Sequence, residues 1–200
     1  MNEQELTTLL AKLLTVKKEH EYVEFKGSNF KPEDIGERIS ALANGAALFG
    51  QSYGYLVFGI EDGTQKVIGT VFKPKQQKIG NNELENWLAQ MLTPHIDFRI
   101  YEFNFQSKPI VLFHIPAAFD QPIKFQNNAF IRVGGITRNL RDFPDKERKL
   151  WQRPSSEFER EIAMHRVSAS DVVALLDTQA FFDLLVKSPY PTTQDGVIDK

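Results

Sequence analysis

The chain has 200 residues, of which 42% are hydrophobic and 25% charged, enough for one folded domain or one domain with an appendage. The absence of cysteine excludes disulfides, thiolate zinc sites and cysteine nucleophiles. No apolar run reaches membrane-spanning length, and the N-terminus lacks a signal-peptide pattern, so we expect a cytoplasmic protein without a membrane partner. With a net charge of −2, any binding to nucleic acid must come from a local basic patch.

The N-terminal part of the chain predicts helices alternating with strands. Leucines at helical spacing predict a helix over Glu3–Leu14, and the proline and acids at 32–34 open a second helix that ends near Phe49. A strand is expected over Tyr22–Lys26. The apolar run Tyr55–Ile60 is typical of a strand in the centre of a sheet. An Asp-Gly turn follows it and predicts a returning strand over Val67–Val71.

The second part of the chain favours an antiparallel meander followed by helices. The predicted elements are a helix Asn82–Leu92, strands Asp97–Phe105, Pro109–Ile115 and Ala129–Val133, and helices Pro144–Trp151 and Ser168–Leu185.

This order of elements predicts an α+β fold with a mixed, mostly antiparallel sheet and helices packed on it. We expect residues 1–150 to form the domain and residues 151–200 a helical extension. The last residues look like the start of a further region that is cut short.

One predicted strand carries an unusual density of charge. Strand side chains alternate between faces, so Glu24 and Lys26 share one face while Val23 and Phe25 share the other. A carboxylate beside a lysine suits the binding of a divalent cation or a phosphate. The alternative interpretation is an edge strand with a solvated charged face.

Four ordered blocks of sequence give this strand a context. They are Glu19 with Glu24-Phe25-Lys26, the helix end Ser40 to Gly45, the strand Gly54 to Gly63, and Phe130-Ile131-Arg132-Val133-Gly134. Together they resemble the Schlafen-type AlbA_2 domain, also called the divergent AAA-4 domain, over roughly Glu19 to Arg141. The glycine pair that precedes the third block in that family is missing, because Tyr55 follows Gly54 directly.

The resemblance implies a domain that binds nucleic acid, and in its Schlafen branch a three-carboxylate site that cuts structured RNA such as tRNA. By motif, the three acids are Glu19, Glu24 and Asp62, which would hold Mg²⁺ or Mn²⁺. Lys26 would neutralise charge on the scissile phosphate. The alternative interpretation of Asp62 is that it only stabilises the Asp-Gly turn. No phosphate-binding Gly-x-x-x-x-Gly-Lys loop exists for ATP.

Basic residues follow the last predicted strand. The candidates for binding phosphates are Arg132 in that strand, Arg138 in the expected glycine loop and Arg141 beyond it. The lysines and arginine at 146–149 are interrupted by acids, which favours a solvated surface over a phosphate-binding role for them.

Two hypotheses of function follow. The first is a nucleic-acid-binding domain of Schlafen AlbA_2 type that is also a metal-dependent endoribonuclease. The second is a non-catalytic DNA-binding module of a transcriptional regulator. A homodimer is expected by analogy with the family alone.

Overall fold

The computed structural model of the protein describes residues 1–15, 21–28, 31–152 and 168. The chain divides into two units, Met1–Ser155 and Ser156–Lys200, and every element named below belongs to the first unit. The predicted helix Ser168–Leu185 lies, apart from its first residue, outside the described residues, as does most of the predicted extension. Both remain predictions.

The centre of the fold is a four-stranded mixed sheet. Its strands are β1 (Val23–Lys26), β2 (Tyr53–Phe58), β6 (Arg99–Phe105) and β7 (Lys108–Pro116), in the order β1-β2-β7-β6. β1 runs parallel to β2, and the other two pairs are antiparallel. This confirms the predicted α+β class and the central position of the apolar strand β2.

The two faces of this sheet are covered by different helices. Helix α1 (Glu3–Thr15) packs Leu10 with Val23 and Phe25 on one face. Helix α2 (Pro32–Leu48) packs on the other face, where Ile39 belongs to the same core as Leu56. Glu24 is in register with Leu56, so its side chain leaves the sheet on the α2 face, as the strand alternation predicts.

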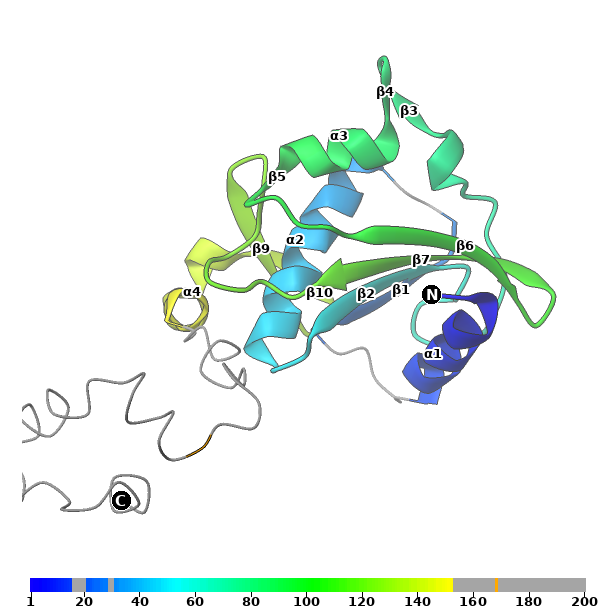
Figure 1. Ribbon diagram of the computed structural model, residues 1–200, viewed down its shortest axis with the longest axis horizontal. Coiled ribbons are helices and arrows are strands. Elements are labelled where there is room, and N and C mark those ends of the chain that lie inside the picture. The colour runs from blue at the N-terminus through cyan, green and yellow to red at the C-terminus, as the bar shows by residue number, and fades with distance from the viewer. Residues whose placement is uncertain (16–20, 29–30, 153–167, 169–200) are drawn as a thin grey trace, which may run out of the picture. The chain divides into compact units, whose positions relative to one another are not determined.

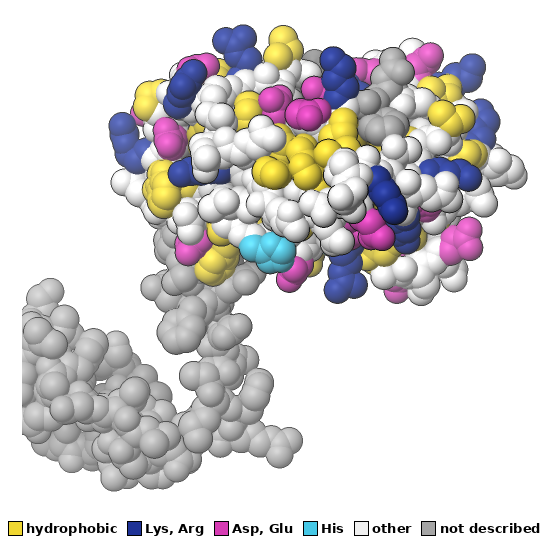
Figure 2. Space-filling view, turned by 90° about the horizontal axis from the view of Figure 1, so that it is seen from above, with side chains coloured by type: hydrophobic (Ala, Val, Ile, Leu, Met, Phe, Trp, Pro, Cys, Tyr) yellow, Lys and Arg dark blue, Asp and Glu magenta, His cyan; other side chains and the backbone are white. Residues whose placement is uncertain are grey.

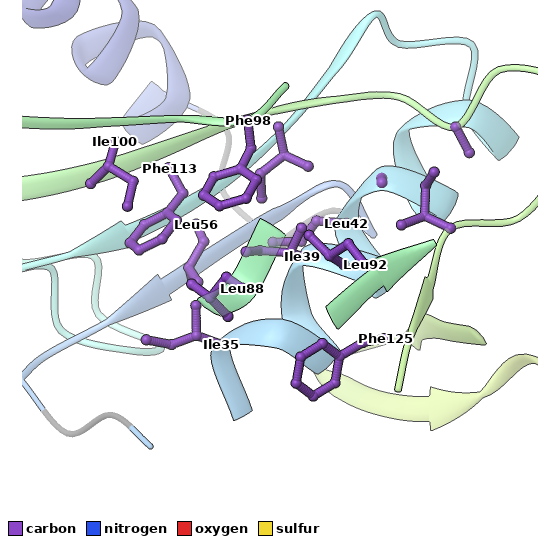
Figure 3. Close-up of a cluster of buried hydrophobic side chains, with 14 of the residues drawn as sticks. Ile35, Ile39, Leu42, Leu56, Leu88, Leu92, Phe98, Ile100, Phe113 and Phe125 are labelled. Carbon is purple, nitrogen blue, oxygen red and sulfur yellow. The ribbon is translucent and has the colours of Figure 1, made fainter. Parts of the chain in front are cut away.

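A second layer of short elements lies against α2 (Figure 1). It contains the antiparallel strands β5 (Leu92–Thr93), β8 (Lys124–Phe125), β9 (Asn128–Val133) and β10 (Ile136–Asn139), with the helices α3 (Leu84–Met91) and α4 (Pro144–Trp151). The two-stranded ribbon of β3 (Lys78–Ile79) and β4 (Asn82–Glu83) contacts α3. Figure 3 shows apolar side chains of α2, among them Ile39 and Leu42, gathered in the main core with Leu56 of the sheet and Leu88 of α3. In the part of the chain that the structure describes, no helix is long and apolar enough to cross a membrane.

Two buried polar residues of α2 bond the helix to β9 and to the chain before β8. The Asn44 amide donates to the carbonyls of Ile123 and Phe130, both at 2.9 Å, and its oxygen accepts from the Ile123 N–H at 2.8 Å. The Ser40 hydroxyl donates to the Ile123 carbonyl and accepts from the Phe130 N–H. Just beyond the β8–β9 pairing, these two side chains of α2 therefore supply hydrogen bonds to buried backbone groups.

Two glycines allow α2 to approach the sheet closely. A Cβ at Gly45 would lie 2.1 Å from the Glu21 carbonyl oxygen, and one at Gly54 would lie 2.6 Å from the Leu42 carbonyl oxygen. Side chains at these positions would push the helix away from β1 and β2. The spacing between helix and strand is therefore set by backbone contact.

Two predictions of local structure are wrong. Val67–Val71 does not form a strand, since only Val67 bridges to Ile60 and the position beside β2 is taken by β7. Residues 134–138 are not a loop, because Ile136–Asn139 form β10 and pair with β9. The turn between them needs only Gly134, which has a φ of +61°.

We expect Asn44→Ala to destabilise the domain by on the order of 3 kcal/mol, because it removes three hydrogen bonds to buried backbone groups of Ile123 and Phe130. The measurement is urea denaturation followed by circular dichroism. Asn104→Ala, at an exposed position of β6, is the matched control and should cost less than about 0.5 kcal/mol. Equal losses for the two variants would contradict this account.

Candidate nucleic-acid interface

A buried carboxylate holds three cations on the α2 face of the sheet. The Glu24 Oε1 atom lies 2.9 Å from Nε of Arg38 and 3.1 Å from Nζ of Lys26. Its Oε2 atom pairs with the guanidinium of Arg132. We call these four residues the Glu24 cluster. Glu24 is 2% exposed, so the interpretation of this side chain as part of a solvated edge is wrong.

The members of the cluster come from three separate elements. Glu24 and Lys26 lie two residues apart on β1, Arg38 lies in the second turn of α2, and Arg132 lies on β9. A buried carboxylate must be paired, because desolvation of an isolated charge is costly. The cluster therefore requires the sheet, the helix and the second layer to meet at one point.

The cations of the cluster differ in their access to solvent. The side chain of Arg132 is fully buried, whereas those of Lys26 and Arg38 are each 24% exposed. Burial by itself would lower the pKa of Lys26, but the charges and hydrogen bonds of Glu24 and Asp62 outweigh it and raise the pKa. Lys26 therefore carries its positive charge throughout the physiological pH range.

Two exposed acids lie at the rim of the cluster. Asp62 accepts a hydrogen bond of 3.0 Å from Lys26, and Asp34 lies 3.6 Å from Arg38. Asp62 is placed by the turn after β2, where Gly59 and Gly63 both have positive φ. The side chain of Asp62 is 59% exposed and that of Asp34 is 46% exposed, so each pair contributes at most about 1 kcal/mol. Asp62 lies in this turn, and its side chain contacts Lys26 of the predicted site.

The described residues do not complete the predicted metal site. Glu24 and Asp62 converge on one cationic position, but that position holds the ammonium group of Lys26. Glu19, the third predicted acid, lies outside the described residues. Among the described residues, no group of three His, Asp or Glu side chains could hold a metal ion. The two acids that are described do not by themselves fit a divalent cation, because Glu24 already pairs with two guanidinium groups.

The predicted phosphate-binding arginines lie in different environments. Arg132 is 1% exposed and pairs with Glu24, so this role corrects the predicted phosphate contact. Arg138 is exposed on β10. Its register partner is Ile131, so it lies on the opposite face of the hairpin from Arg132. Arg141 is also exposed, and its Nε lies 3.9 Å from Asp142.

Sequence reasoning missed Arg38. The only signal was its position on α2, directly before Ile39 of the apolar stripe and four residues after Asp34. That position brings Arg38 to the border of the buried face. The position does not predict that Arg38 meets a carboxylate from β1 there.

Comparison with known protein families identifies the family of the chain. The family description "Schlafen, AlbA_2" matches residues 19–141, more than half of the chain. The protein belongs to the Schlafen AlbA_2 family, as the four sequence blocks predict. No curated protein matches the chain.

Two solved structures show a weaker similarity. The DIP2311 protein from Corynebacterium diphtheriae is 17% identical with a TM-score of 0.42, over 68% of this chain. The chain spans 26% of the length of that protein. The N-terminal domain of an ATP-dependent DNA helicase RecG-related protein from Nitrosomonas europaea is 21% identical with a TM-score of 0.40, over 59% of this chain and 75% of that one. The family assignment rests on the family match.

We expect Glu24→Gln to destabilise the domain by about 3–5 kcal/mol, because it removes the negative charge that pairs with the buried guanidinium of Arg132. Denaturation in guanidinium chloride measures the loss. Asp62→Asn removes a carboxylate from the exposed rim and should cost less than about 1 kcal/mol. A loss below about 1 kcal/mol for Glu24→Gln would contradict the role assigned to this carboxylate.

Proposed function

We propose that this domain binds nucleic acid and that Lys26 and Arg38 contact its phosphates. The observation that carries the proposal is the Glu24 cluster. One buried carboxylate holds two partly exposed cations in fixed positions on the surface of a Schlafen AlbA_2 domain. Cations that are already ordered lose little conformational entropy when a phosphate binds.

The rim acids do not oppose this binding strongly. Asp34 and Asp62 are exposed, and their ion pairs with Arg38 and Lys26 are worth little in water. A phosphate oxygen can replace either carboxylate on the same cation. The buried Glu24 stays in place and continues to hold both cations.

The surface charge of the protein supports a local site. The net charge is −2, and on the face shown in Figure 2 the basic side chains are interspersed with acidic ones. Sequence-independent attraction over a broad surface is therefore weak. Binding depends on a few positioned contacts, to which the exposed Arg138 and Arg141 can add.

Metal-dependent cleavage of structured RNA is the second candidate function. The observation that favours it is that Glu24 and Asp62 converge on one cationic position. It requires that a third acid, predicted to be Glu19, join them and that Lys26 give up this position. Without cleavage, the domain acts as a binding module such as that of a DNA-binding regulator.

We expect Lys26→Gln to weaken binding to a tRNA and to a DNA duplex, and to reduce the slope of log K against log salt by about one. Fluorescence anisotropy at several salt concentrations measures both quantities. Lys12→Gln removes the same charge from the exposed side of α1, on the opposite face of the sheet, and should change neither. The proposal fails if the wild type binds no nucleic acid, or if the two variants behave alike.

Cleavage is tested with the same tRNA in the presence of Mn²⁺. We expect a nuclease to lose its activity in Asp62→Asn, a variant that keeps the fold because Asp62 is exposed. Cleavage by the wild type alone supports the endoribonuclease. Binding without cleavage, or equal cleavage by both proteins, supports the binding module.

A further inference from the structure

The α1 face of the sheet carries a group of aromatic side chains beside the part that α1 covers. Tyr53 and Tyr55 of β2, His114 of β7 and Tyr101 of β6 lie on this face, as the register of the three strands shows. We call these four residues the aromatic stripe. Nearer the helix, the same face is filled by apolar side chains such as Val57 and Leu112.

The rings of the stripe support one another. Tyr53 stacks on His114 with centroids 4.0 Å apart and planes 28° apart. Tyr55 lies 5.6 Å and Tyr101 lies 6.5 Å from the same imidazole. The stripe therefore offers π-faces that are held in place across three adjacent strands.

The ring at the centre of the stripe is neutral at physiological pH. Burial lowers the pKa of His114, and the positive charges of the amino terminus and Arg99 lower it further. Arg99 is exposed and directly opposite His114 in the register of β6 and β7. The stripe thus combines uncharged rings with a cation at its side.

Packing of the core alone does not account for this arrangement. Tyr53 stacks on its neighbour while 41% of the residue stays exposed, and Tyr55, Tyr101 and His114 are only partly buried. An aromatic ring with one face on a rigid support and the other side open to solvent is suited to stack a flat ligand. The cation beside it suits a ligand that carries negative charge.

We propose that the aromatic stripe stacks unpaired nucleobases of a single-stranded segment of nucleic acid, with Arg99 against the sugar-phosphate chain. The inference rests on the proposed function and adds a second contact surface to it. Stacking on aromatic rings tolerates any base, so the stripe recognises unpaired bases without reading their sequence.

The positions of the two surfaces favour a flexible ligand. The stripe and the Glu24 cluster lie on opposite faces of the sheet, separated by the edge strand β1. Tyr55 is in register with Val23, which lies three residues before Lys26, about 10 Å along the strand. A single strand can pass around this edge and reach both surfaces. A rigid duplex cannot.

The experiment compares two single-stranded DNA oligonucleotides of equal length, one with bases and one abasic throughout. We expect Tyr53→Ala to weaken binding of the oligonucleotide with bases by about 5- to 100-fold and to leave the abasic one unchanged. Tyr53→Phe keeps the ring and should bind like the wild type. Thermal unfolding of each variant controls for the fold, and Tyr53 is exposed enough for the alanine variant to remain folded.

The outcomes separate this inference from the proposed function. If Tyr53→Ala and Tyr53→Phe bind the oligonucleotide with bases equally well, the stacking role is overturned. Weaker binding of both oligonucleotides by Lys26→Gln would then leave the phosphate site standing. If the wild type binds neither oligonucleotide nor the tRNA and duplex, both proposals are overturned. A loss in Tyr53→Ala that is confined to the oligonucleotide with bases supports the stripe.

Discussion

The pairing of the buried Glu24 carboxylate with three cations is the interaction on which the described domain depends. Its partners come from β1, α2 and β9, so the charge is compensated only when the sheet, the helix and the second layer are assembled together. Buried ion pairs of this kind contribute little net stability compared with apolar packing. Their effect is to exclude other arrangements, since any displacement of β9 leaves a buried charge without its partner.

Helix α2 connects the Glu24 cluster to the rest of the fold through its packing and hydrogen bonds. Its apolar residues fill the main core, while Ser40 and Asn44 bond to the chain around β8 and β9. The backbone contacts at Gly45 and Gly54 keep the helix close to the sheet. Arg38 is therefore held at the point where Glu24 emerges from β1. The geometry of the charged site follows from the packing of one helix.

The functional proposals place two kinds of chemistry on the two faces of one sheet. The α2 face carries positioned cations, and the α1 face carries partly exposed rings. Charged contacts respond to salt, whereas stacking responds to the presence of unpaired bases. A ligand that uses both faces must be flexible enough to pass β1, the edge of the sheet. Under both proposals, the ligand is therefore a nucleic acid with single-stranded segments.

Local patterns in the sequence determined the described helices and the longer strands of the first unit, and they indicated its family. Leucine spacing set α1, proline and acids opened α2, and alternation placed Glu24 and Lys26 on one face of β1. Only the tertiary structure decided that Glu24 is buried, that Arg132 is its partner and that Ile136–Asn139 form a strand. The physical reason is distance along the chain. The compensation of a buried charge and the pairing of a short strand depend on neighbours that periodicity within one segment does not specify.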